Sequence, residues 1–242
     1  MAHEKSIFEE LAPFSKMVVD QGRGVVVSDL AFASAEDRYS TAFIQLAGSV
    51  LSANSNVKLF QKNVGETGQG SAVNLTIAET NNKQGDRQPS NQVYIGTHLG
   101  FQLYRLASSG ALNVLPFGAG AESVSDMYKV AASTTWSLNV GDGIERTLGT
   151  VLEYPAGSGI DTPAAIPSGS GVGTTNPAAF APNNGWVGCK KRKLPIPVIF
   201  PPNISVDIQL LTGAAQTLGS VNSGDYIAYR ATFTGFRMTL PA

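Results

Sequence analysis

Short apolar runs separated by turn signals fill most of this sequence, and they constrain its fold more than any other feature. The runs cover residues 57–60, 73–77, 93–106, 112–117, 136–140 and 144–154. Asp142 and Gly143 stand between the last two, as in a tight hairpin turn, which requires residues that tolerate positive φ. Short strands with turns between them are typical of an antiparallel sandwich or barrel, so we predict an all-β fold.

The two C-terminal runs indicate which side of each strand is buried. Val206, Ile208 and Leu210 alternate with polar residues, which is the period of a strand with one buried face. In the last run, the apolar residues change parity at Gly235. We therefore predict one long, bent final strand with a glycine bulge that returns the later apolar residues to the same face, and this fits a sandwich better than a small barrel.

The N-terminal segment has helical spacing instead. Ser6 and Glu9 form a capping box, and Pro13 should kink or end the helix that follows. We predict a short amphipathic helical arm over residues 1–20, which docks either on a neighbouring subunit or on its own domain. Its apolar anchors are Ile7, Phe8, Leu11 and Phe14.

A second segment also shows helical spacing. Tyr39, Phe43, Leu46 and Val50 follow another capping box and would share one face of a helix. The pattern favours a helix over about residues 35–52, although residues 43–46 could extend as a strand.

The length of 242 residues allows one large domain or two small ones. We place a first β-sandwich at residues 21–133 and a second at 134–242, with a single sandwich as the alternative. Residues 155–188 are rich in Gly and Pro, and Asp161 is their only charge. They predict a long loop that is a floppy surface excursion, is ordered against a neighbouring subunit, or decorates an exposed surface.

Charge is scarce along the chain. Charged residues make up 14% of the sequence, against about 25% in ordinary soluble domains, and the formal net charge is −1. A charge-poor surface suits a chain that covers itself with other protein. The balance of charge excludes a strongly basic nucleic-acid binder as a description of the whole chain.

The residues that most enzymes and metal sites require are also scarce. His3 and His98 are the only histidines and Cys189 is the only cysteine, so we predict no zinc site and no internal disulfide. His98 lies in a strand-like run and is expected to be a half-buried or exposed strand residue. No nucleophile elbow accompanies it. We therefore expect no catalytic activity and no cofactor.

One cluster of charge stands out, directly after Cys189. It consists of Lys190, Lys191, Arg192 and Lys193. Four adjacent cations could contact the phosphates of packaged nucleic acid or the headgroups of an internal membrane, or they could form a solvated loop edge.

Two segments resemble the strands and joints of viral capsid proteins: YIGTHLGFQLY at residues 94–104 and LPIPVIFPPN at residues 194–203. The chain resembles the jelly-roll major capsid proteins of small tailless icosahedral bacteriophages, which often stack two jelly rolls in one chain. The resemblance implies a homotrimeric capsomer, an N-terminal arm near the inner surface, and strands that stand upright in the shell.

The expected function is that of a structural protein that self-assembles into an icosahedral shell around a genome. Its partners would be copies of itself and other virion proteins, and its location would be the virion after synthesis in the host cytoplasm. The alternative is a glycan-binding β-sandwich, such as a phage spike or receptor-binding component, in which Trp186 is a better stacking platform than Trp136.

Deletion of residues 1–19 tests the predicted arm. We expect the shortened chain to lose assembly, measured by light scattering, while its β-type circular dichroism stays intact. Loss of the folded signal would instead place the helix in the core of its own domain.

Overall fold

The computed structural model of the chain describes residues 33–70, 74–85, 87–106, 114–115, 121–141, 146–154 and 191–239. The predicted arm at residues 1–20 and the predicted loop at residues 155–188 lie outside them. The described elements, in chain order, are β1 (Ala33–Gln45), β2 (Val50–Leu51), β3 (Asn56–Leu59), β4 (Gln92–Leu106), β5 (Val114–Leu115), α2 (Ala121–Ser133), β6 (Thr134–Val140), β7 (Arg146–Thr150), the 3-10 turn η3 (Val151–Glu153), β8 (Arg192–Phe200), β9 (Val206–Thr212), β10 (Gln216–Thr217) and β11 (Tyr226–Thr239).

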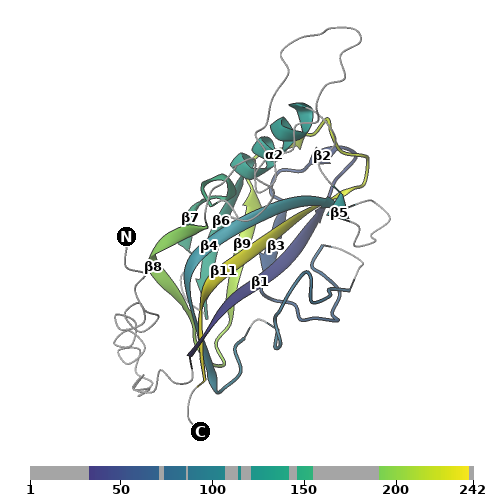
Figure 1. Cartoon of the computed structure of the whole chain (residues 1–242). Coiled ribbons are helices and arrows are strands. Elements are labelled where there is room, and N and C mark those ends of the chain that lie inside the picture. Colours follow the sequence, from purple (N-terminus) through teal and green to yellow (C-terminus); the bar gives the residue numbers. More distant parts are fainter. Residues whose placement is uncertain are drawn as a thin grey trace, which may run out of the picture.

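The strands form two antiparallel sheets that pack against each other (Figure 1). The first sheet has the order β1-β11-β4, and β5 and β8 both lie beside β4. The second sheet has the order β3-β9-β6-β7, and β2 and β10 form a small separate pair. The predicted all-β sandwich is therefore confirmed for the described part of the chain.

The pairing of the strands is nested rather than sequential. β1 pairs with β11, β3 with β9, β4 with β8, and β6 with β7, so that successive pairs alternate between the two sheets. β11 also pairs with β4, and β9 with β6. The predicted division into sandwiches at residues 21–133 and 134–242 is wrong, because strands from both sides of that boundary share each sheet. The described residues form one sandwich.

Aromatic side chains fill the core between the sheets. Trp136 of β6 is 1% exposed, and its ring centroid lies 4.9 Å from that of Tyr154 and 5.6 Å from that of Phe101 of β4. The contact with Tyr154 is edge-to-face and the contact with Phe101 is tilted. Aromatic contacts of this kind add to the stability that burial of the ring surface provides. The expectation that Trp136 is a core residue is confirmed.

The helix expected over residues 35–52 is wrong, because most of this segment is strand β1. Ala42 and Ile44 belong to the main core, whereas Phe43 belongs to a second cluster with Leu75 on the outer face of the sheet. Thirteen consecutive residues of β1 pair with β11, which holds the segment extended. Because β1 is buried on both faces, it has apolar residues on both, and some of their spacings resemble those of an amphipathic helix.

The register change predicted at Gly235 is confirmed, but the extra residue lies in the neighbouring strand. Pairing of β1 with β11 runs unbroken through Gly235, whereas the β11 partners in β4 jump from His98 to Gly96. Thr97 of β4 is therefore the unmatched residue.

The predicted return of the later apolar residues to the main core is wrong. Phe236 and Met238 are buried, but they are not in the cluster that contains Phe233. Arg237 lies between them and lines a cavity beside Tyr94. Strand alternation continues through Gly235, so these two apolar side chains lie on the opposite side of the sheet from Phe233.

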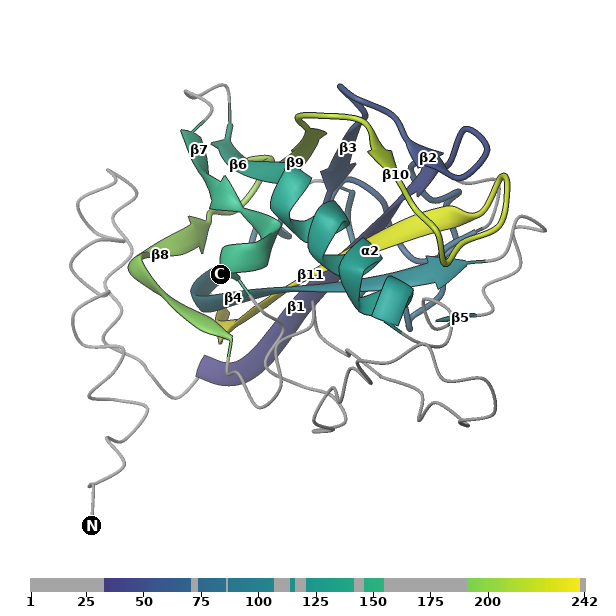
Figure 2. The same ribbon diagram turned by 90° about the horizontal axis from the view of Figure 1, so that it is seen from above.

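One helix, α2, lies across an end of the sandwich (Figure 2). Met127, Val130 and Ala131 face the main core, which is the spacing of an amphipathic helix. Asp126 fixes the helix by accepting hydrogen bonds from the backbone N and the Oγ of Ser220, each at 2.7 Å. Our sequence analysis did not predict this helix.

Replacement of Gly235 by alanine tests the close approach of β11 to β4. A Cβ atom there would lie 1.9 Å from the carbonyl oxygen of Ile95, so a backbone must move. We expect G235A to lower the free energy of unfolding by about 2–4 kcal/mol in urea denaturation.

Gly213→Ala is the matched control, because a Cβ atom there lies 3.6 Å from the nearest atom, the carbonyl oxygen of Ser133. Its free energy of unfolding should stay within about 1 kcal/mol of the parent. Equal effects of the two substitutions would contradict the steric explanation.

Candidate functional site

The described part of the cationic run lies where β8 begins. Lys191, Arg192 and Lys193 are described, whereas Lys190 and the arm residues Ile7, Phe8, Leu11 and Phe14 lie outside the described residues. The predictions for those five residues stay predictions.

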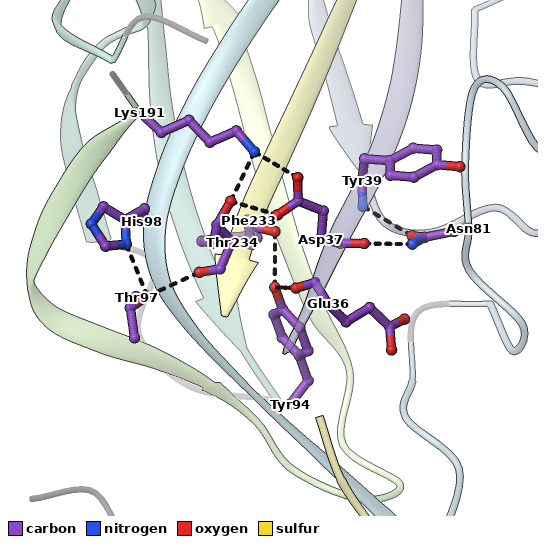
Figure 3. A network of polar contacts seen from close by, with 10 residues as sticks. All are labelled: Glu36, Asp37, Tyr39, Asn81, Tyr94, Thr97, His98, Lys191, Phe233 and Thr234. Carbon is purple, nitrogen blue, oxygen red and sulfur yellow. Dashed lines mark hydrogen bonds and ion pairs between the residues drawn. The ribbon is translucent and has the colours of Figure 1, made fainter. Parts of the chain in front are cut away.

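Lys191 reaches two other strands of its sheet (Figure 3). Its Nζ donates to Oδ2 of Asp37 in β1 at 2.8 Å and to Oγ1 of Thr234 in β11 at 2.8 Å. The Thr234 hydroxyl in turn donates to Oδ1 of Asp37 at 2.5 Å. The three side chains form a closed polar triangle that ties the start of β8 to β1 and β11.

Strand register explains why these residues meet. Asp37, Thr234 and His98 are direct partners across β1, β11 and β4, and His98 is the partner of Lys193 in β8. Partners in a ladder point to the same face of a sheet. The row therefore presents polar side chains from four strands on one face.

The environment of Asp37 stabilises its ionised form. Partial burial acts to raise the pKa of Asp37, but hydrogen bonds from Lys191 and Thr234, with the charges of Lys191 and Arg230, outweigh it and hold the pKa below its ordinary value of 3.8. The carboxylate is thus ionised throughout the neutral range.

Arg192 is also engaged by its own chain. Its guanidinium lies 3.4 Å from Oε2 of Glu153 and 4.7 Å from the ring centre of Tyr154, a cation–π contact. Lys193 is exposed and makes no ion pair with any described residue. The prediction that the run contacts phosphate or lipid is untested, but Lys191 and Arg192 have intramolecular partners and do not form a purely solvated edge.

His98 is half-buried, as expected, and it contacts a threonine. Its Nδ1 lies 2.9 Å from Oγ1 of Thr97, the unmatched bulge residue. The Thr97 hydroxyl donates its only proton to the carbonyl oxygen of Thr234 at 3.1 Å. Nδ1 must then be the donor toward Thr97, which leaves Nε2 as the acceptor nitrogen of the neutral ring.

Within the described segments, no group of three or more His, Cys, Asp and Glu side chains is arranged to hold a metal ion. None of the helices found there is long and apolar enough to cross a membrane.

A cavity of about 30 Å³ lies at the end of the sandwich opposite α2, where β1 and β4 begin and β11 ends. Its walls come from these three strands and from the segment that precedes β4. The lining residues are Glu36, Arg38, Asn81, Asn82, Lys83, Arg87, Gln88, Pro89, Gln92, Tyr94 and Arg237. Four of them are basic and one is acidic.

Arg38 is the most unusual of these residues, because it is only 6% exposed and has no carboxylate within ion-pair distance among the described residues. Its guanidinium lies 4.7 Å from the ring centre of Phe200 and 5.7 Å from that of Phe60. Nε donates to Oδ1 of Asn82 at 3.2 Å, and the side-chain oxygen of Gln88 faces the two Nη atoms when its amide is oriented to accept. Burial lowers the pKa of Arg38 to about 10, so the group stays cationic at neutral pH.

Sequence reasoning missed this cavity. Its residues are far apart in the chain, and Arg38 lay in a segment predicted to be helical. Strand-like alternation of Arg38, Ser40, Ala42 and Ile44 was the available signal, because it places an arginine in line with apolar core residues.

No protein-family model matches the chain, and the search of curated proteins gave no significant match.

Replacement of Asp37 by asparagine tests the polar triangle. The Asp37 carboxylate is half exposed, so we expect D37N to lower the free energy of unfolding at pH 7 by only about 0.5–1 kcal/mol. The pKa of this carboxyl is depressed in the folded state. The difference between parent and variant should therefore be complete above the ordinary pKa and disappear as the pH falls through the lower folded-state value.

Urea denaturation at a series of pH values measures this difference. A double-mutant cycle with Lys191→Met serves as the control, since the coupling between the two substitutions should vanish with the carboxylate charge. If the effects of the two substitutions on the free energy of unfolding were strictly additive at pH 7, the polar triangle would be contradicted.

Proposed function

We propose that this chain is a viral capsid subunit, in which one jelly-roll sandwich per chain assembles with its copies into an icosahedral shell around a genome. The nested strand pairing carries the proposal. Two supporting observations are the exposed apolar side chains on the sheet edges and the scarcity of charge. The resemblance of residues 94–104 and 194–203 to phage capsid strands agrees with it.

Eight of the strands have four residues or more: β1, β3, β4, β6, β7, β8, β9 and β11. Numbered in that order, the first pairs with the eighth, the second with the seventh, the third with the sixth and the fourth with the fifth. This is the pattern of a long antiparallel hairpin wrapped around a core so that its pairs alternate between two sheets. Eight strands in two sheets are typical of jelly rolls, which are common in viral capsids and also occur in lectins and cupins.

The fold alone does not determine function, so the proposal needs a surface suited to self-contact. β7 and β8 are edge strands of their sheets within the described residues, and they lie on the same side of the sandwich in both views (Figures 1 and 2). Ile196 of β8 is 68% exposed and Leu148 of β7 is 41% exposed. Exposed apolar side chains on a sheet edge favour association with another chain, here a second copy in a trimeric capsomer.

The alternative of a glycan-binding sandwich has less support. Trp136 is buried and cannot act as a stacking platform for a sugar. Trp186 lies outside the described residues. Lectins share the jelly-roll architecture, so this alternative becomes an outcome of the experiment below.

The oligomeric state of the purified full chain tests the proposal. We expect light scattering and negative-stain electron microscopy to show trimers or closed shells. Strictly monomeric protein at high concentration would overturn it, as would small oligomers that bind glycans and never form shells.

Replacement of Ile196 by aspartate tests the β7–β8 edge. The charge would be placed where the contact buries an apolar side chain, so assembly should require about tenfold more protein. Ile77→Asp is the matched control, because Ile77 is equally exposed at 66% but lies in a turn away from this edge. Both variants should keep their β-type circular dichroism, and equal effects on assembly would contradict a contact at the edge.

A further inference from the structure

We propose that the cavity lined by Glu36, Arg38, Lys83 and Arg237 is an anion site that binds a phosphate group. Nothing in the capsid proposal requires it. The argument rests on the charge of the lining, on the state of Arg38 and on the construction of the walls.

The lining has a strong excess of positive charge. Its basic residues are Arg38, Lys83, Arg87 and Arg237, and Glu36 is its only acidic residue among those described. Glu36 is paired with Arg237, with 3.0 Å between Oε2 and Nε. Lys83 is an exposed residue of the lining and makes no ion pair with a described carboxylate. In a protein that is nearly neutral and poor in charge, this concentration of cations is local to one end of the sandwich.

Arg38 supplies a buried cation that has no carboxylate within ion-pair distance among the described residues. Burial of a charge without a partner is costly, and buried arginines are normally paired with a carboxylate. A guanidinium has five N–H donors, of which three face Asn82 and Gln88. The other two have no acceptor among the described residues. A bound oxyanion would accept from such a donor pair and compensate the charge.

The guanidinium is also held in place before any ligand arrives. The rings of Phe60 and Phe200 pack against it, and the Phe200 ring is in turn held by Phe233 at 5.1 Å and Tyr94 at 5.4 Å. A cation with fixed orientation loses little entropy on binding, which favours affinity.

The wall opposite Arg38 is built by backbone contacts. Arg87 and Gln88 form β-bridges to Ser205 and Pro202, and Asn203 N donates to the carbonyl oxygen of Gln88 at 3.1 Å. Asn82 Nδ2 donates to the carbonyl oxygen of Lys62 at 3.3 Å. These hydrogen bonds fix the position of the wall, so the cavity is formed before a ligand binds.

The size and the charge of the cavity together favour a small anion. About 30 Å³ corresponds to a few water molecules or one small oxyanion. A phosphate group, either free or at the backbone of a nucleic acid whose remaining atoms stay outside, is an anion of this kind that accepts from guanidinium donors.

Two charge changes in the cavity lining test the site in the full-length chain. The obvious variant, Arg38→Met, alters the aromatic packing and can unfold the protein. Lys83→Gln removes a free cation, and we expect it to weaken inorganic phosphate binding about tenfold. Glu36→Gln removes the carboxylate that competes for Arg237, and we expect it to strengthen binding. Lys62→Gln is the control, because Lys62 is exposed nearby but does not line the cavity.

Binding is measured by calorimetry and by the thermal shift in sodium phosphate against sodium chloride of equal ionic strength. Phosphate affinity that falls in K83Q, rises in E36Q and is unchanged in K62Q supports a site for free phosphate. If these changes in affinity are seen only with a short oligothymidylate, the result supports a site for nucleic-acid phosphate. The same affinity and thermal shift in all four proteins, or no binding of either probe, overturns the proposal.

Discussion

The rest of the sandwich depends on β11, which is hydrogen-bonded along both of its edges. It joins β1, the first described strand, to β4 in the middle of the chain. The first sheet therefore cannot close until the C-terminal residues are present. Pairings between residues so distant in sequence are slow to form, because the entropy of loop closure precedes the gain from contacts. Until then the facing edges of β1 and β4 are open to other chains.

The local sequence pattern predicted the positions of individual strands well, but it did not predict which strands pair with each other. The alternation around Ile208 located β9, and the parity change at Gly235 located the irregularity in β11. Neither pattern contains information on which strand lies alongside. The boundary placed at residue 133 was wrong for that reason: it follows the order of the sequence, whereas nested pairing interleaves the two halves of the chain in each sheet.

The candidate sites were hidden by two different physical causes. In β1, burial on both faces made Phe43 look like part of a helical stripe, and this concealed the inward position of Arg38. In β8, the sequence displayed adjacent cations but not their partners. Strand alternation and the row of residues across the sheet direct Lys191 to Asp37, and Arg192 to Tyr154. Adjacent charges in sequence can therefore have separate structural roles.

The two proposed surfaces share no described residue, but one buried residue connects them. No lining residue of the cavity comes from β7 or β8, so a contact along that edge leaves the cavity open. Phe200, the last residue of β8, nevertheless packs beneath the Arg38 guanidinium. A phosphate group that holds Arg38 in place also holds this ring, and with it the end of the strand that presents Ile196. Because a ligand stabilises the folded state to which it binds, occupancy of the cavity would favour the ordered β8 edge on which assembly is proposed to depend.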